Sequence, residues 1–118
     1  MKTSEILKAA KAKIEQGWTQ NAEARTAPGG MDCYANCELA VCWCAMGAVF
    51  VVVNASVLAR WRHPDINNAV AMLEAVVGGD VAVWNDEPGR TQDEVVAMFD
   101  KAIAMADMAE EYERREGV

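Results

Sequence analysis

The sequence predicts an all-α protein, a small compact helical bundle of about four helices with one long polar loop. Its 118 residues are enough for one hydrophobic core and too few for two ordinary domains. A composition of 53% hydrophobic and 25% charged residues is typical of folded globular proteins. Apolar residues also recur at helical spacing in several segments. We therefore expect a single helical domain over residues 1–118.

The first helix is expected to be capped by Thr3 or Ser4 and to end near residue 16, before Gly17. Its apolar stripe consists of Ile6, Leu7, Ala10 and Ile14. The following residues 19–32 are polar and include a Pro-Gly-Gly triplet that begins at Pro28. Because such a triplet breaks helical periodicity, we expect a long exposed loop there.

The second helix is expected to run from about Cys37 to Val53, a segment that is apolar nearly all round, as in a helix at the centre of a bundle. Within it, Gly47 would let another backbone come close. The β-branched run from Val51 to Val53 could instead form a strand, although the sequence indicates no partner strand for it. Helix is the preferred interpretation.

A third helix is expected to begin near Asp65 and to end at the Gly-Gly pair that starts at Gly78. Its apolar residues are Ile66, Ala69, Val70, Leu73, Val76 and Val77. Residues 80–90 should then form an extended connector that closes in a type II turn. Pro88 and Gly89 suit the two central positions of that turn, which require φ near −65° and a positive φ.

The last helix should follow this turn directly. Thr91 stands three residues before Glu94, which is the spacing of a capping box. The apolar face of this helix consists of Val95, Met98, Phe99, Ala102, Ile103 and Ala106.

The charge of the chain narrows the classes of partner. A net charge of −7 argues against direct contact with nucleic acid, since phosphate recognition needs clustered Lys and Arg.

The longest apolar run, Leu39 to Val53, is shorter than the roughly 20 residues that cross a bilayer. The first residues alternate Lys and Glu with Ala and lack the apolar core of an export signal. These features predict a cytoplasmic protein without membrane contact.

Motifs for catalysis are absent from the sequence. It has no G-x-S-x-G, H-E-x-x-H or phosphate-loop pattern, and its two Gly-Gly pairs are interpreted as turns. Its one histidine, His63, has no cysteine near it in sequence. We therefore assign no catalytic residue and no cofactor, and we do not expect an enzyme.

Four cysteines, Cys33, Cys37, Cys42 and Cys44, lie in one short segment. Their C-x3-C-x4-C-x-C spacing lacks the paired C-x2-C motifs of a zinc ribbon. On a helix, Cys33 and Cys37 would share a face, whereas Cys42 and Cys44 would point about 200° apart. The four residues therefore remain a fallback metal site only. The alternative is that Cys42 and Cys44 are small buried hydrophobic residues in a reducing cytoplasm.

The segment from Trp84 to Thr91 is the main binding candidate. It places Trp84, Asn85, Asp86, Arg90 and Thr91 around one tight turn at a helix start. Here Asp86 and Arg90 could orient a polar ligand while backbone N–H groups of the helix bind an anion. The same residues could instead staple the turn, with Trp84 in the core and Thr91 as the cap. Asp86 would then pair with Arg90.

Three motifs carry a resemblance: GWTQ from Gly17, CAMGAV from Cys44, and VAVWNDEPGRTQDEV followed by FDKAI. Together they resemble a family of short proteins of unknown function from actinobacteria and their phages. The W-N-D-x-x-G-R-T element is the specific part. The positions that match these motifs are Trp18, Cys44, Trp84, Asn85, Asp86, Arg90 and Thr91. The resemblance implies no established activity.

Two functional hypotheses follow. The first is a small non-enzymatic interaction protein, encoded by a phage and acting on a host protein, with exposed aromatic residues such as Trp61 at its surface. The alternative is a small-molecule or metal-binding domain that uses the Cys33–Cys44 cluster or the Trp84–Thr91 loop. Seven Met, four Trp and an apolar helix are more than a small bundle easily buries, which favours a homodimer.

Overall fold

In a computed structural model that describes residues 1–117, the chain forms five α-helices and a three-stranded sheet. The helices are α1 (Thr3–Gln16), α2 (Ala45–Val53), α3 (Pro64–Val77), α4 (Val81–Asn85) and α5 (Gln92–Arg115), with a 3-10 turn η1 (Arg60–Arg62). The strands are β1 (Ala24–Arg25), β2 (Asp32–Cys33) and β3 (Cys42–Trp43). The protein is mostly helical, but the expectation of a purely all-α bundle is wrong.

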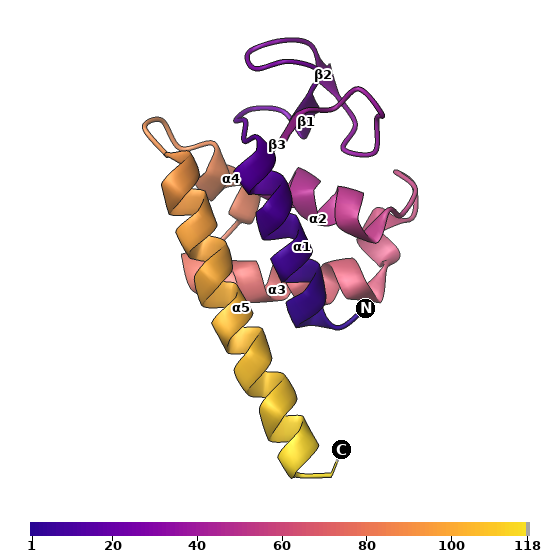
Figure 1. Cartoon of the computed structure of the whole chain (residues 1–118), viewed down its shortest axis with the longest axis vertical. Helices are drawn as coiled ribbons and strands as arrows, with labels where there is room; N and C mark the ends of the chain where they lie inside the picture. The colour runs from indigo at the N-terminus through magenta and orange to yellow at the C-terminus, as the bar shows by residue number, and fades with distance from the viewer. Residues whose placement is uncertain (118) are drawn as a thin grey trace.

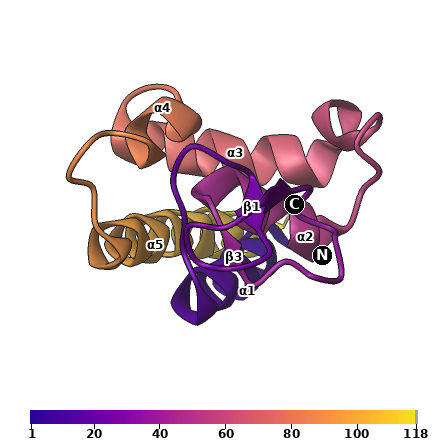
Figure 2. The ribbon, with the colours of Figure 1, turned by 90° about the horizontal axis from the view of Figure 1, so that it is seen from above.

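The helices pack around α1, which contacts α2, α3 and α5. Figure 1 shows the small sheet at one end of the molecule and the C-terminal part of α5 projecting beyond the other helices at the opposite end. Figure 1 shows α3 running across the direction of α5, Figure 2 shows the same two helices from above, and the two helices are in contact. No helix within residues 1–117 has both the length and the apolar character needed to span a membrane.

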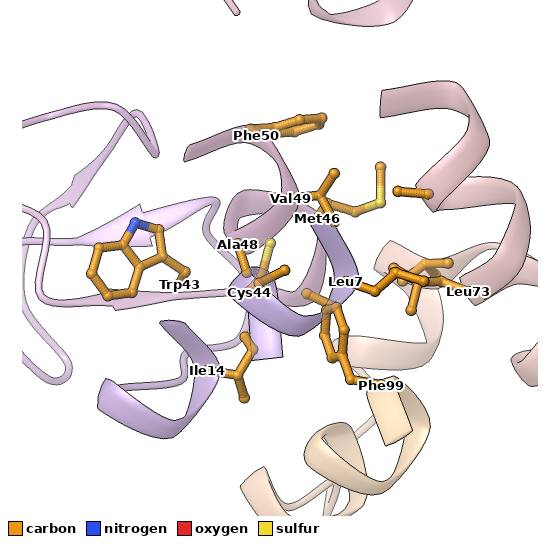
Figure 3. Close-up of a cluster of buried hydrophobic side chains, with 14 of the residues drawn as sticks. Leu7, Ile14, Trp43, Cys44, Met46, Ala48, Val49, Phe50, Leu73 and Phe99 are labelled. Atoms are coloured by element: carbon orange, nitrogen blue, oxygen red, sulfur yellow. The ribbon is translucent and has the colours of Figure 1, made fainter. Parts of the chain in front are cut away.

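The hydrophobic core lies between α1, α2, α3 and α5. Figure 3 shows Leu7, Val49, Leu73 and Phe99 meeting there, one from each helix, and each of them is fully buried. Complete burial of one such side chain is worth about 1.5–3 kcal/mol. Within each of α1, α3 and α5, the buried apolar residues recur at helical spacing. This spacing is therefore the main reason that the three helices form where the sequence predicts them.

The ends of the helices follow local rules with one exception. Gly17 ends α1, Gly78 ends α3 with φ 76°, and the capping box of Thr91 and Glu94 opens α5, all as expected. The predicted cap of α1 is wrong, since Lys2 is the N-cap and Ser4 lies inside the helix. Ser4 is buried, and its Oγ donates a hydrogen bond of 2.7 Å to Glu110 on α5.

The expected helix from Cys37 to Val53 is wrong in its first half, because α2 begins only at Ala45. Residues 42–43 form β3 instead, an antiparallel neighbour of β1. The Cys44 side chain caps α2 by accepting from the backbone N–H of Gly47 at 3.3 Å. Within residues 37–44, Cys42, Trp43 and Cys44 are buried, whereas Leu39 and Val41 are exposed.

Residues 19–32 are also more ordered than the expected exposed loop. β1 lies in this stretch at the centre of the sheet, whose strand order is β2-β1-β3, and Ala24 is fully buried. Gly47 permits this arrangement, because an added Cβ there would lie 2.1 Å from the carbonyl oxygen of Glu23. The expected close approach of another backbone at Gly47 is therefore confirmed, and it fixes Glu23 against α2.

The expected extended connector over residues 80–90 is wrong as well. Asp80 caps the short helix α4 by accepting from the backbone N–H of Val83 at 3.0 Å. The turn after α4 has the expected form, since the backbone N–H of Arg90 donates to the Glu87 carbonyl at 3.0 Å and Gly89 has φ 86°. α4 brings Asn85 and Asp86 to the junction of α1, β1 and α2.

Candidate functional site

Asn85 lies at the centre of a buried network of hydrogen bonds. Its side chain is fully buried. Oδ1 accepts from the indole Nε1 of Trp18 at 2.9 Å and from the backbone N–H of Ala45 at 3.0 Å. Nδ2 donates to the carbonyl of Thr19 at 3.2 Å and to Oδ1 of Asp86 at 3.0 Å. Both donors and both acceptor positions of this amide are occupied.

Two further contacts extend this network to the surface. Gln20 Nε2 donates to the carbonyls of Asn85 and Glu87, at 3.0 and 2.8 Å. Asp86 Oδ1 also accepts from the backbone N–H of Asn21 at 2.9 Å. We call this group the Asn85 cluster: Trp18, Thr19, Gln20, Asn21, Ala45, Asn85 and Asp86. It joins segments that carry all three motifs of the sequence.

The second half of the Trp84–Thr91 segment forms a separate unit. The Cζ atom of Arg90 lies 3.9 Å from the centroid of the half-buried Trp84 ring, over its face. The Nε atom of Arg90 donates to the Trp84 carbonyl at 2.9 Å. Arg90 is 3.5 Å from Glu94, while Asp86 belongs to the Asn85 cluster, so the expected pairing of Asp86 with Arg90 is wrong. The backbone N–H of Thr91 donates to Glu94, which lowers the pKa of that carboxyl group.

The cysteines lie in different elements of the structure. Cys33 lies in β2 and Cys42 in β3, while Cys44 caps α2. Within residues 1–117, no three His, Cys, Asp or Glu side chains are grouped so as to hold a metal ion. Cys42 and Cys44 are buried, as the hydrophobic interpretation predicts. Burial raises the pKa of the Cys44 thiol to about 11, and burial followed by the nearby Cys37 raises that of Cys33.

A cleft of about 470 Å³ lies beside the Asn85 cluster, with walls from α2, α3, α4, η1 and the chain before β1. We call it the Arg60 cleft. Its apolar lining includes Met46, Phe50, Trp61 and Val70. The Trp61 ring stands edge-on to the Phe50 ring, with centroids 5.3 Å apart. Such a wall suits the apolar part of an organic ligand.

Arg60 is the most unusual residue of this cleft. Its side chain is 5% exposed, its guanidinium lies 4.0 Å from the Phe50 ring centroid, and Nη1 forms an ion pair with Glu23. Nε and Nη2 are buried and meet no acceptor anywhere in residues 1–117. A buried donor without a partner costs about 1–3 kcal/mol, so an arginine in this state calls for an explanation.

Carboxylates also line the cleft. They come from Glu74 on α3, from Asp80 before α4 and from Asp86 after it. Oδ1 of Asp80 caps α4 and Oδ1 of Asp86 serves the Asn85 cluster. With Glu23, the lining has four carboxylates and one guanidinium, which gives the cleft three formal negative charges in excess.

An exposed apolar segment adjoins Arg60 in the chain, and of its residues Trp61 lines the cleft. The side chains of Val57, Leu58 and Trp61 are 40%, 91% and 60% exposed. Trp61 therefore lies at the surface, as expected from the sequence. The sequence did not indicate Arg60 as a site residue, because Arg60 and Arg62 flank Trp61 symmetrically and nothing in this pattern shows which arginine is buried.

Comparison with known families matches residues 1–105 to a Family of unknown function (DUF6197), and the chain belongs to this family. The matched region contains the Asn85 cluster and every residue of the Arg60 cleft named above. No match is found among curated proteins or among solved structures.

Proposed function

We propose that this member of the family of unknown function is a non-catalytic binding protein whose ligand occupies the Arg60 cleft. The observation that carries the proposal is the buried guanidinium of Arg60, with Nε and Nη2 unpartnered within residues 1–117, beside an apolar wall. A ligand with an acceptor group would complete the hydrogen bonding that the chain leaves open. The small-molecule hypothesis from the sequence used the Cys33–Cys44 cluster or the Trp84–Thr91 loop, and of those residues Cys44 and Asp86 line this cleft.

The chemistry around the cleft favours binding over catalysis. The thiol that lines it, Cys44, has its pKa raised to about 11 by burial, so at neutral pH it is a neutral thiol and a weak nucleophile. The ring of His63 serves as the cap of α3, with Nδ1 accepting from the backbone N–H of Asp65 at 3.2 Å. Neither group is arranged as an activated nucleophile or base.

The proposal is tested by a thermal-shift screen of a metabolite library against the protein and two variants. Ala82→Trp places a large side chain on the exposed lining of the cleft, and Ala104→Trp makes the same change on the exposed surface of α5. A ligand of the cleft raises Tm by several degrees in the wild type and in Ala104→Trp but not in Ala82→Trp. Ligands that stabilise Ala82→Trp equally well would contradict the proposal.

A protein partner is a second candidate, favoured by the exposed segment that carries Val57, Leu58 and Trp61. Contiguous exposed apolar side chains are typical of interaction surfaces. The resemblance to phage and actinobacterial proteins suggests a host protein in the bacterial cytoplasm as the partner. Leu58→Asp should then abolish recovery of a partner from lysate, whereas Leu39→Asp should not. Leu39 is a suitable control because it is an exposed leucine, 68% exposed, that lies outside the Val57–Trp61 segment.

Self-association would use a different surface, the projecting part of α5. Met105, Met108 and Tyr112 are 40%, 73% and 67% exposed, and their spacing places them on one stripe of the helix. Two copies could bury these stripes against each other as a homodimer. Sedimentation analysis would then give a dimer for the wild type and a monomer for Met108→Glu.

A further inference from the structure

The free part of the Arg60 guanidinium has the shape of a carboxylate site. A guanidinium can bind a carboxylate with two parallel N–H donors, and Nε together with Nη2 forms one of the edges that do so. Glu23 is bonded to Nη1, which is outside this edge. Within residues 1–117, both nitrogens of the edge are without an acceptor. One complete bidentate edge of a 5% exposed arginine thus has no partner in residues 1–117. Because both of its nitrogens are shielded from solvent, a ligand reaches this edge only when the side chains around it shift.

The remaining charges of the cleft exclude a simple anion as the occupant. Glu23, Glu74, Asp80 and Asp86 outnumber Arg60, and the cleft has three formal negative charges in excess. A lone anion placed there would be repelled by these carboxylates at short range, where partial burial weakens screening by solvent. A ligand that also carries a positive charge would offset this repulsion, because its cation can lie next to these carboxylates.

The apolar wall adds a third requirement. Met46, Phe50, Trp61 and Val70 offer no charged group, so the part of the ligand that lies on them should be a hydrocarbon or an aromatic ring. A ligand that meets all three requirements has a carboxylate, a cationic nitrogen and an apolar side chain.

We infer that the Arg60 cleft binds a zwitterionic amino acid with an apolar side chain. Its carboxylate accepts from Nε and Nη2 of Arg60, and its ammonium group lies among the carboxylates of Glu74, Asp80 and Asp86. Its side chain packs on Phe50. This inference rests on the proposed function and names the ligand class for the same cleft. A short peptide with an apolar residue at its C-terminus shares part of this chemistry.

Isothermal titration calorimetry with three matched probes tests the inference. L-leucine carries both charges, leucinamide lacks the carboxylate, and N-acetyl-L-leucine lacks the cation. We expect L-leucine to bind and each blocked form to bind at least about tenfold more weakly, since each loses one charged hydrogen-bonding group. The dipeptide leucyl-leucine separates the two sources, because tighter binding of the dipeptide than of leucine would identify a peptide terminus.

Variants locate the carboxylate and the ammonium. Arg60→Lys keeps the charge but lacks the paired donors, and it should weaken leucine binding by about ten- to a hundredfold. Glu74→Gln removes an exposed carboxylate of the cleft and should weaken binding by several-fold. Glu113→Gln removes an exposed carboxylate of α5 outside the cleft and should leave the affinity unchanged. Melting temperatures close to that of the wild type would show that the variants are folded.

Two results overturn the inference and are distinguishable from failure of the proposed function. If leucinamide or N-acetyl-L-leucine binds as tightly as L-leucine, the zwitterion is wrong while the cleft remains a ligand site. If none of the probes binds but the screen returns ligands that Ala82→Trp excludes, the ligand class alone is wrong. If the screen returns no such ligand either, both proposals fail.

Discussion

The Asn85 cluster and the Arg60 cleft are adjacent and share Asp86, yet they treat buried polar groups in opposite ways. Asn85 is fully buried, and all four of its side-chain hydrogen-bonding positions are occupied by the chain itself. Arg60 is 5% exposed, and within residues 1–117 two of its three nitrogens have no acceptor. A buried side chain whose hydrogen-bonding positions are all occupied cannot bond to a ligand as well. A buried side chain with unpartnered donors is stabilised when a ligand supplies an acceptor.

This contrast separates two effects that mutations can have. Changes in the Asn85 cluster should lower the free energy of unfolding, because they break bonds that hold α1, α2 and α4 together. Changes in the Arg60 cleft should affect binding, and their cost in stability should depend on whether the charges are removed singly or in pairs. The predictions below test this separation, from the largest expected effect to the smallest.

The largest effect is expected for Asn85→Leu. The substitution keeps the number and branching of the side-chain heavy atoms but leaves Trp18 Nε1, Ala45 N–H and the Thr19 carbonyl without their partner. Since each orphaned buried group costs about 1–3 kcal/mol, the free energy of unfolding should fall by about 4 kcal/mol. Urea unfolding measures it. The exposed Asn68→Leu is the control, and a loss for Asn85→Leu no greater than for this control would contradict the structural role.

The second effect distinguishes single from paired changes in the cleft. Arg60→Met alone leaves the partly buried Glu23 carboxylate without its cation and should cost about 3 kcal/mol in the free energy of unfolding. Adding Glu23→Gln removes the stranded charge, and the double variant should be within about 1 kcal/mol of the wild type. A double-mutant cycle by chemical denaturation measures the coupling. Additive losses in the double variant would show that the two side chains act independently.

The third effect concerns the backbone contact between the two regions. Gly47→Ala would bring a Cβ to 2.1 Å from the Glu23 carbonyl oxygen, and the chain just before β1 would have to move. We expect a loss of about 2 kcal/mol in the free energy of unfolding. Gly79→Ala is a matched control, because an added Cβ there has no atom of residues 1–117 within 4 Å. Equal stability of the two variants would contradict the proposed contact.

The smallest effect is a pH dependence at the start of α5. The pKa of Glu94 is lowered chiefly by the hydrogen bond from the Thr91 backbone, so its folded-state pKa lies below its unfolded value. The stabilisation is therefore complete at neutral pH and is lost as the pH falls through the folded-state pKa. Glu94→Ala should accordingly lower Tm more at pH 7 than at pH 3. An equal effect at both pH values would contradict this assignment.

Local signals explain how much of the fold the sequence predicted. α1, α3 and α5 have apolar spacing and terminal residues that act within one turn of chain, and all three were predicted. The sheet was missed because two-residue strands show no pattern of their own. Its strands pair across distance in sequence, as Ala24 does with Trp43. Pairing of this kind depends on the tertiary fold, and it replaced the first half of the expected helix at Cys37–Val53.

The candidate site was only partly predictable for a related reason. Asn85 and Asp86 were singled out because they stand in a distinctive motif, and in the structure both belong to the Asn85 cluster. Arg60 was missed because its burial depends on Glu23, which lies just before β1, and on Phe50 in α2. An arginine beside Trp61 and Leu58 has the sequence context of an ordinary surface residue. Its unpartnered nitrogens become visible only when all of its neighbours are in place.

The most direct test of the contrast is a ¹H–¹⁵N NMR titration with L-leucine that follows side-chain N–H signals. The account predicts that the Arg60 Nε–H and the Trp61 indole N–H shift with increasing ligand. It also predicts that the Trp18 indole N–H, which is bonded to Asn85 at 2.9 Å, stays in place. Shifts confined to Trp18 and Asn85, with Arg60 unchanged, would contradict the account and make the Asn85 cluster the binding site.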